Sequence, residues 1–554
     1  MSESASASKP DPRRRLRLGP KRVVLALLLI GVLMLAVLGG QATWLVFAKP
    51  GSFPQGPALL MEAVESAQPP AGREHDAPNA HALLWDAYAI YSTERTRIDT
   101  RLSEAFDARA EADPAWDALI DRARLRSPQL DFSMVGDPIE DSLSAIEGDT
   151  WQDAEREYYE LIERESREAI GPMLDAGLRE ALAQLAASPR ATMVEPAPNQ
   201  PLIGILLPEL GNARQLARFN RARMRLALER GDELEFVQAY EEGLALARVT
   251  GTQPVLISQL VTYAILAMML EEGNDALVGG DLADETILAM GEALRRQVPK
   301  PIDAAFGMKG ERLWVIDIVH RSHTDSENGM FMPGEYQKYM WNPAGGLRIQ
   351  NALGVLAPRK QETLARVNEA YDLLDRMASV PPMQRVDLES RLMDMLDASR
   401  GMSPILRDFV PAIGKAMQSA DRIAATLESS RLALHVERHR IRTGELPAGQ
   451  RELENLGSPV SIDPFAPDGA KLRYARSSRA PRGFVVYSVG FDGVDNGGVP
   501  GLETYRQWQG TGEAPTDAVV GGRGLRKLGL SGVMVDGFVP PDETPEAGPD
   551  DQDD

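Results

Sequence analysis

The stretch Leu210–Arg248 reads LGNARQLARFNRARMRLALERGDELEFVQAYEEGLALAR, and it sets the fold class expected for the chain. Apolar residues recur at helical spacing on both sides of the dipeptide Gly231-Asp232, which breaks the chain. They are Leu216, Phe219 and Leu226 before the break, and Leu234, Val237, Leu244 and Ala247 after it. Two such stripes joined by a tight turn predict an antiparallel helical hairpin, and hence a mainly α protein.

This hairpin resembles one tetratricopeptide unit, with Gly231-Asp232 at the turn and Ala239-Tyr240 in the second helix. The pattern does not recur at the period of about 34 residues that such repeats show. Two arrangements therefore stay open for the helical part of the chain: a superhelix of similar hairpins, and a generic helical bundle.

Helix-forming sequence extends on both sides of the hairpin. Five segments are rich in Ala, Leu, Glu and Arg and poor in Gly and Pro, which favours helices. They are Ala80–Ala110, Trp151–Ala187, Asp284–Arg296, Gln361–Met377 and Val386–Ala398. A Pro-rich linker lies near residues 189–208, and the aromatic segment Ser322–Gly346, with its Gly, Asn and Pro residues, is expected to form a long loop. We expect residues 80–416 to form a helical ectodomain.

The run Val255–Leu270 is apolar enough to be considered as a membrane span. It is only 16 residues long and contains Ser258, Gln259 and Thr262. A span needs about 20 predominantly apolar residues. We therefore expect a helix that is buried in the protein core.

The segment Val23–Phe47 is expected to be a transmembrane anchor. Its first 18 residues carry no charge, and a helix of that length covers about 27 Å of a hydrocarbon layer that is about 30 Å thick. The preceding arm, residues 1–22, holds seven basic and two acidic residues. Basic arms stay in the cytoplasm, so we expect a single span in the inner (cytoplasmic) membrane, with the bulk of the chain extracytoplasmic. The alternative is a cleaved signal peptide, with small residues at Gly40-Gln41-Ala42 and Val46-Phe47-Ala48.

The composition of the chain limits its partners and its chemistry. The 554 residues carry a net charge of −21, which argues against binding to nucleic acid, because phosphates need a basic surface. There is no cysteine, so disulfides, Cys-ligated zinc and thiol nucleophiles are excluded. Residues 48–79 are rich in Pro and Gly and are expected to be a tether, and the acidic tail 536–554 is expected to be disordered.

The sequence changes character near Met417, and residues 417–535 are expected to form a small α+β domain. A helix is predicted over Met417–Arg442, ended by Gly444 as a C-cap. Two β-rich runs, Lys471–Tyr474 and Phe484–Val489, flank a turn and predict a hairpin. The following loop, Gly490–Gly498, is dense in Gly, Asp and Asn, which favours positive φ angles.

Three motifs in this region resemble the globular part of the type II secretion major pseudopilins. They are Gly444-Glu445-Leu446-Pro447, Asp463-Pro464-Phe465 and Tyr487-Ser488-Val489-Gly490-Phe491-Asp492-Gly493. The resemblance covers about residues 417–500 and implies a pilin-like domain. It also implies a calcium ion on the Asp-rich loop, with Asp492 in the motif and Asp495 as a nearby candidate. The alternative is that these acids only cap turns.

The chain departs from the pseudopilin layout at its N-terminal side. The apolar segment lies far upstream of the pilin-like region, and Gly19-Pro20-Lys21-Arg22 does not fit the prepilin peptidase site. We therefore expect a single-pass protein that carries a pilin-like module, and not a polymerising subunit. The overall layout also resembles that of large membrane proteins of planctomycete-type bacteria.

Candidate catalytic residues are few. His435 and His439 lie at i, i+4 on a predicted helix, but no third ligand at helical spacing completes a metal site. His320 and His323 have no acid at a fixed spacing. The sequence has no nucleophile elbow, Walker loop or dinucleotide fingerprint. We therefore name no catalytic or cofactor-binding residue.

The expected function is that of a non-enzymatic, membrane-anchored scaffold that binds protein partners, associated with a type II secretion or pilus-like envelope assembly. An envelope hydrolase with an unrecognised site and a structural envelope protein are the alternatives. A pocket that joins His320 and His323 to several acids would favour the hydrolase. An apolar groove over Leu210–Leu270 would favour the binding protein.

Overall fold

The computed structural model is mainly α-helical, which confirms the expected fold class. The structure describes residues 38, 41, 43–45, 48–67, 79–113, 128–136, 151–189, 191, 200–204, 207–279, 282–340, 355–398, 404–455, 461–466, 468–490, 493–499, 517–521, 525 and 534–536. The basic arm and most of the anchor predicted over residues 23–47 lie outside this part of the chain, as does most of the acidic tail.

The chain divides into two compact units. The smaller one comprises residues 1–53 and 317–365, and the larger one comprises residues 54–316 and 366–554. In the smaller unit, Leu45, Met330 and Met332 form a buried cluster. The loop expected over Ser322–Gly346 is wrong in part, because it contains helix α12, Pro333–Met340. A proline at the first helical position is pre-organised for a helix, which explains why α12 begins there.

The central hairpin of the larger unit is confirmed. Helix α7 is Pro208–Arg230 and helix α8 is Glu233–Gly251. Gly231 closes α7 with a φ of 68°, and the N–H of Asp232 donates to the carbonyl of Ala227 at 2.8 Å, as in a Schellman motif. The Asp232 carboxylate then accepts a hydrogen bond from the N–H of Glu235 at 3.1 Å and caps α8.

The prediction is wrong for one residue of the second stripe. Leu234 lies in the first turn of α8 with 80% of its side chain exposed. The buried face of α8 instead carries Phe236, Ala239, Tyr240 and Leu244. Leu234 points away from this face, which is the side of α8 that α7 and α9 cover.

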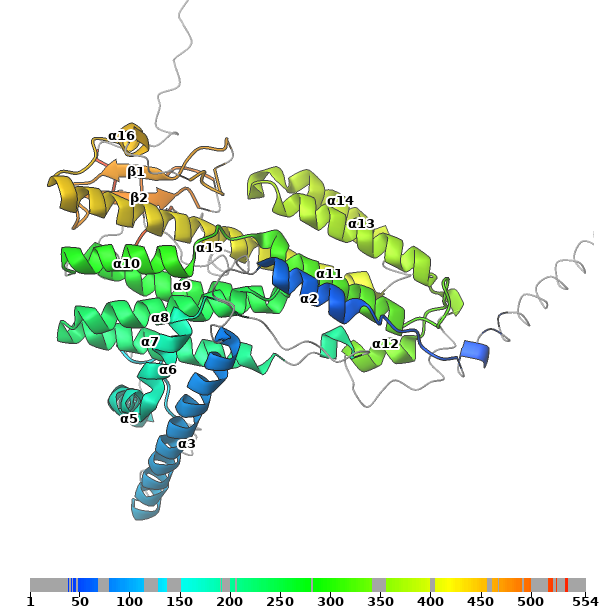
Figure 1. The fold of residues 1–554 in the computed structure, drawn as a ribbon, viewed down its shortest axis with the longest axis horizontal. Coiled ribbons are helices and arrows are strands. Elements are labelled where there is room, and N and C mark those ends of the chain that lie inside the picture. The colour runs from blue at the N-terminus through cyan, green and yellow to red at the C-terminus, as the bar shows by residue number, and fades with distance from the viewer. Residues whose placement is uncertain are drawn as a thin grey trace, which may run out of the picture. The chain divides into compact units, whose positions relative to one another are not determined.

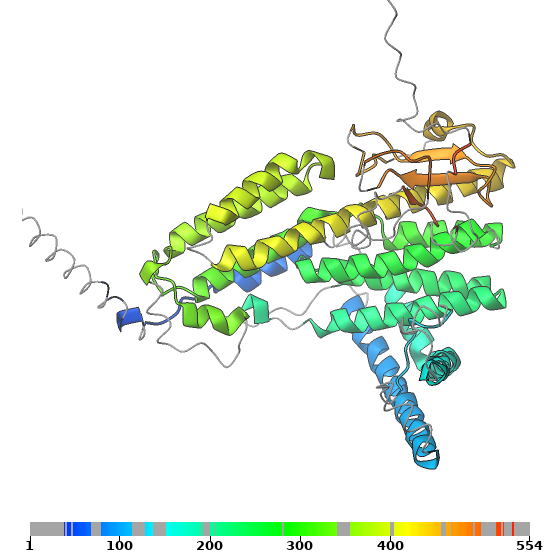
Figure 2. The same ribbon diagram turned by 180° about the vertical axis from the view of Figure 1, so that it is seen from behind.

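Helices α9 (Leu256–Gly279), α10 (Asp284–Gln297) and α15 (Pro404–Thr443) continue the stack that α7 and α8 begin. Figures 1 and 2 show α7, α8, α9 and α10 side by side, with α15 running along α9 and α10. Within the described chain, α9 is long and apolar enough to cross a membrane, but most of it is buried in the helical body. A core helix meets the same test, and this burial agrees with the core helix expected at Val255–Leu270.

Buried ion pairs connect α7 to its two neighbours. Arg221 and Arg225 on α7 both donate to Glu272 on α9, at 2.6 and 2.7 Å. Arg223 donates to Glu242 on α8 and to Asn220 on its own helix. Guanidinium groups at these depths need such partners, because an unpaired buried charge is strongly destabilising.

The remaining predicted helices are also confirmed. Their observed bounds are α3 Ala80–Ala112, α5 Trp151–Met173, α6 Arg179–Ala187, α13 Lys360–Ala378 and α14 Val386–Ala398. A π-helical turn, Leu174–Leu178, joins α5 to α6 and places Gly177 at a φ of 106°. Helices α2 (Gly56–Ala67) and α11 (Ala304–Arg321) and the 3-10 turns Leu202–Gly204 and Pro382–Gln384 complete the described elements of this kind.

The C-terminal part contains helix α16 (Gln450–Asn455) and an antiparallel sheet of order β1-β2-β3. Its strands are β1 Arg473–Arg476, β2 Phe484–Ser488 and β3 Ala518–Val519. The predicted hairpin is confirmed, with Arg473 opposite Tyr487 and Arg476 opposite Phe484. Helix α15 begins at Pro404, upstream of the predicted Met417, and packs against β2 (Figure 2).

Candidate binding cavity

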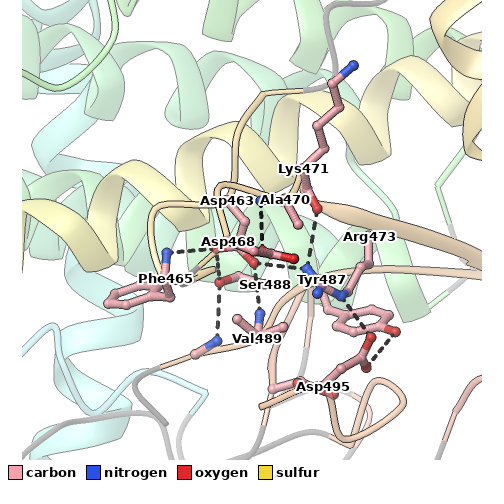
Figure 3. A network of polar contacts seen from close by, with 12 residues as sticks. Asp463, Phe465, Asp468, Ala470, Lys471, Arg473, Tyr487, Ser488, Val489 and Asp495 are labelled. Atoms are coloured by element: carbon pink, nitrogen blue, oxygen red, sulfur yellow. Dashed lines mark hydrogen bonds and ion pairs between the residues drawn. The ribbon is translucent and has the colours of Figure 1, made fainter. Parts of the chain in front are cut away.

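Two of the C-terminal motifs, Asp463-Pro464-Phe465 and the stretch that begins at Tyr487, meet in a polar network around Asp463 (Figure 3). One carboxylate oxygen of Asp463 accepts from the N–H of Phe465 at 3.0 Å and from the hydroxyl of Ser488 at 2.7 Å. The other accepts from the N–H of Val489 at 2.9 Å. Asp463 is fully buried, and it fixes the loop before β1 to the end of β2.

The predicted calcium ligands lie in and beside this network. Asp492 is outside the described residues. The Asp495 carboxylate accepts from Arg473 Nε at 2.8 Å, from the Tyr487 hydroxyl at 3.1 Å and from the N–H of Gly497 at 3.0 Å (Figure 3). Burial and then the Asp495 carboxylate raise the pKa of Tyr487. A calcium ion at Asp495 would have to share this carboxylate with Arg473, and calcium binding stays a prediction.

The loop conformation expected here is confirmed. Gly490, Gly493, Gly497 and Gly498 all have φ values near 70°. The Asp517 carboxylate accepts from the N–H groups of Asn496 and Gly498. The backbone thus directs N–H donors toward a carboxylate at this part of the loop.

The histidines considered from the sequence lie in two places. His435 and His439 share α15, and burial followed by Arg438 lowers the pKa of His435. In the smaller unit, His320 stacks on Phe53 at 5.1 Å between ring centroids, and His323 Nδ1 lies 2.7 Å from the carbonyl of Val319. Across the described chain no three His, Asp or Glu side chains gather as a metal site.

A cavity of about 1090 Å³ opens in the larger unit, on the side of α8 and α9. Its apolar wall comes from α6, α8, α9 and the segment that leads into α11. The apolar side chains in this wall are Ala183, Ala186, Ala187, Ala247, Leu266, Val298, Ile302 and Phe306. Tyr263 of α9 also lines the cavity, and burial raises the pKa of its hydroxyl.

Arg248, near the C-terminal end of α8, is half-buried and lines the cavity without a carboxylate partner among the described residues. Its Nε donates to the side-chain oxygen of Gln297 at 2.9 Å, and its Nη2 donates to the carbonyl of Leu185 at 3.3 Å. Burial lowers the pKa of Arg248 to about 10. The carbonyls at the C-terminal end of α6 compensate the guanidinium only in part, since a helix terminus carries about half a charge.

Two of the described carboxylates that line the cavity, Glu241 and Glu242, are paired with arginines. Glu241 accepts from Arg296 at 3.0 and 2.8 Å and from Gln297 at 3.1 Å. Glu242 is bound by Arg223, which lies behind the cavity wall. Asp303 accepts from the N–H of Ala305 at the start of α11.

Two exposed lysines, Lys300 and Lys309, complete the charged lining, and Lys309 lies over the Phe306 ring at 6.0 Å. The unbalanced charge of the cavity is therefore positive, although the whole chain is strongly acidic.

Sequence reasoning did not find Arg248. One signal was present: neither i±3 nor i±4 of Arg248 carries an Asp or Glu. The same is true of Arg223, which nevertheless has a carboxylate from another helix. Local spacing therefore cannot separate a paired arginine from an unpaired one, because the partner arrives through tertiary packing.

Comparison of the chain with protein-family models, with curated proteins and with solved structures finds no match.

Proposed function

We propose that this chain is a non-enzymatic, membrane-anchored binding protein that takes an anionic partner into the Arg248 cavity. The observation that carries the proposal is the half-buried Arg248 guanidinium, which lines an open, mostly apolar cavity and has no carboxylate partner among the described residues. Ligand pockets typically have volumes of about 300–1,000 Å³ and combine an apolar lining with a few polar groups that fix orientation. A volume of about 1090 Å³ and one oriented cation fit that description.

The cavity also favours binding over the hydrolase alternative. Its lining contains residues of α8 and α9 and neither His320 nor His323. Glu241 and Glu242 in the lining are engaged by Arg296 and Arg223, which makes them poor general bases.

Site-specific photo-crosslinking in native membranes tests this proposal. We would place p-benzoylphenylalanine at Ala187, an exposed residue of the cavity lining, and at Gln184 as a control, which is exposed on the same helix but outside the lining. The expected result is an adduct, read by intact mass, at Ala187 only. Arg248→Met should abolish it. Equal adducts at both positions, or an adduct that survives Arg248→Met, would contradict the proposal.

Association with a type II secretion or pilus-like assembly is a separate part of the proposal, and its support is the sequence resemblance over residues 417–500. Chemical crosslinking of the tagged full-length protein in native membranes, followed by mass spectrometry, tests it. Enrichment of secretion or pilus components is expected. Their absence from the crosslinked material, with other partners recovered, would remove this part and leave the binding proposal in place.

A further inference from the structure

The free donors of Arg248 define the head group that the cavity selects. Of the five guanidinium N–H bonds, one on Nε is used by Gln297 and one on Nη2 by Leu185. The end of the fork, formed by Nη1 and the second N–H of Nη2, has no partner among the described residues. This pair of parallel donors matches the two oxygens of a carboxylate.

The charge around Arg248 limits the head group to a single negative charge at that position. The neighbouring cation Arg296 already holds Glu241 through two hydrogen bonds. Lys300 and Lys309 are exposed, so water screens their charges. Among the described lining cations without a carboxylate partner, Arg248 is therefore the one that is half-buried, whereas Lys300 and Lys309 are exposed.

The polar side chains of the lining indicate what kind of group is attached to the head group of the ligand. Most of them bond within the protein: Gln259 to the carbonyls of Gly251 and Gln253, and Gln297 to the carbonyl of Ala186. Thr252 and Thr262 likewise donate to carbonyls of their own helices, those of Val249 and Ser258.

Such a lining offers few groups to the N–H and C=O groups of a peptide, which are costly to bury unpaired. A hydrocarbon chain needs no such partners. The apolar residues of α6 and α9 and the side chains of Ile302 and Phe306 supply the surface on which it would pack.

We infer that the cavity binds a monoanionic amphiphile, a single hydrocarbon chain that ends in a carboxylate, with the carboxylate on Nη1 and Nη2 of Arg248 and the chain along Leu266, Ile302 and Phe306. This inference rests on the proposed function, because it names the chemical class of the ligand at the same site.

A photoactivatable long-chain fatty acid added to membranes that contain the full-length protein tests the inference. Adducts are expected on peptides that line the cavity. Arg248→Met should lower their yield about tenfold or more, since hydrogen bonds to a charged group contribute that much to affinity. The matched control is Arg295→Met, an exposed arginine of α10 outside the lining, which should leave the yield unchanged.

Two further labelling experiments distinguish the contribution of the carboxylate head group from that of the hydrocarbon chain. The corresponding fatty alcohol probe, which lacks the carboxylate, should label the cavity about tenfold less than the acid. Ile302→Trp should lower labelling by filling the cavity without touching the charge, and its melting temperature reports whether the fold is kept. Equal labelling by acid and alcohol, or labelling outside the cavity, would overturn the inference.

The two proposals fail in different ways. If the Ala187 crosslink forms and depends on Arg248 while the fatty acid probe does not label the cavity, the ligand class is wrong and the binding function stands. If the Ala187 crosslink does not form, the binding function itself is lost.

Discussion

Arginines in the larger unit occupy two kinds of environment. Arg223 and Arg225 are buried and meet carboxylates from neighbouring helices, and these pairs join the helices of the stack. Arg248 is half-buried, faces a cavity and makes only neutral hydrogen bonds. A charge that remains uncompensated inside a fold is costly, which is why we assign it to a ligand and not to stability.

Glu272 offers a direct test of the paired class. It is buried and accepts from both Arg221 and Arg225. Glu272→Ala leaves two guanidinium groups without this partner, and we expect a loss of about 3–5 kcal/mol in the free energy of unfolding. The adjacent Glu271, a partly exposed partner of Arg221 at 3.3 Å, is the matched control.

Glu271→Ala should cost less than about 1 kcal/mol, as is typical of pairs in contact with water. Urea denaturation of both variants gives the comparison. Similar losses for the two substitutions would show that the buried network does not carry the stability assigned to it.

Glu311 on α11 should make stability depend on pH. Burial raises its pKa to about 7 from 4.5, against a hydrogen bond from the N–H of Leu256. The folded chain therefore keeps a proton that the unfolded chain loses as the pH rises. The free energy of unfolding is therefore highest below about pH 4.5, where Glu311 is protonated in both states. It falls by up to about 3 kcal/mol as the pH rises to about 7, where the folded chain also loses the proton.

Glu311→Gln removes this titration and keeps a hydrogen-bond acceptor for Leu256. We expect the variant to be more stable than the natural chain at about pH 8 and to show a flatter profile between about pH 5 and 7. Urea denaturation across this range measures both. An unchanged slope in Glu311→Gln would assign the pH dependence to other groups.

At the scale of elements, the glycines of α8 and α10 report how closely the helices pack. A Cβ built on Gly243 of α8 would lie 2.0 Å from the sulfur of Met269 on α9. A Cβ on Gly291 of α10 would have Leu434 as its nearest neighbour, at an ordinary contact distance of 3.9 Å. The same change should therefore have opposite effects at two helical positions.

Gly243→Ala should lower the free energy of unfolding by about 1–3 kcal/mol, because overpacking displaces Met269 and α9. Gly291→Ala should raise it by up to about 1 kcal/mol through helix propensity alone. Thermal and urea unfolding of the two variants test this pair. A gain in stability at both positions would mean that α8 and α9 separate easily.

Sequence periodicity was sufficient for most elements, because helices such as α3, α10 and α13 contain long runs of good helix formers. The hairpin of α7 and α8 was predictable from its stripes and from Gly231-Asp232. Leu234 was assigned to the wrong face because apolar character alone does not fix which turn is covered. Helix α12 was missed because eight residues carry too little periodicity to separate a short helix from a loop.

The candidate cavity was beyond sequence reasoning for a different reason. Its lining comes from α6, α8, α9, α10, α11 and the segment between α10 and α11, several of which are distant in sequence. The pairing of Glu241 and Glu242, and the lack of a carboxylate for Arg248, follow from this assembly. The sequence analysis stated only that an apolar groove over Leu210–Leu270 would favour a binding protein, and Ala247, Tyr263 and Leu266 of this stretch line the cavity.

At the scale of the whole molecule, the C-terminal sheet and the central helices share one hydrophobic core, which includes Tyr240, Leu434 and Val486. Arg482, in the turn between β1 and β2, donates to the carbonyls of Leu277 and Leu282 beside α9 and α10. The C-terminal sheet is therefore packed on the central helices by both apolar and polar contacts.

Two segments of the chain have the length and composition of a membrane span, Val23–Gly40 and α9, and the burial of α9 argues against a span there. The polar groups of α9 bond inside the protein: Ser258 donates to Gln253 at 2.8 Å, and the hydroxyls of Thr262 and Thr250 lie 2.8 Å apart. These internal hydrogen bonds are typical of a helix that is buried in a protein core. We therefore expect the segment Val23–Phe47, and not α9, to anchor the chain.

Alkaline carbonate extraction of native membranes tests this expectation. The full-length chain should stay in the membrane pellet, and a chain without residues 1–47 should be released into the soluble fraction. A matched full-length variant, Ile30→Arg, places a charge near the middle of the apolar run, where it costs about 3 kcal/mol, and should shift the protein toward the soluble fraction. Retention of the truncated chain in the pellet would assign the anchor to α9 or to another segment. If α9 is the anchor, its buried position would describe only one conformation of the protein.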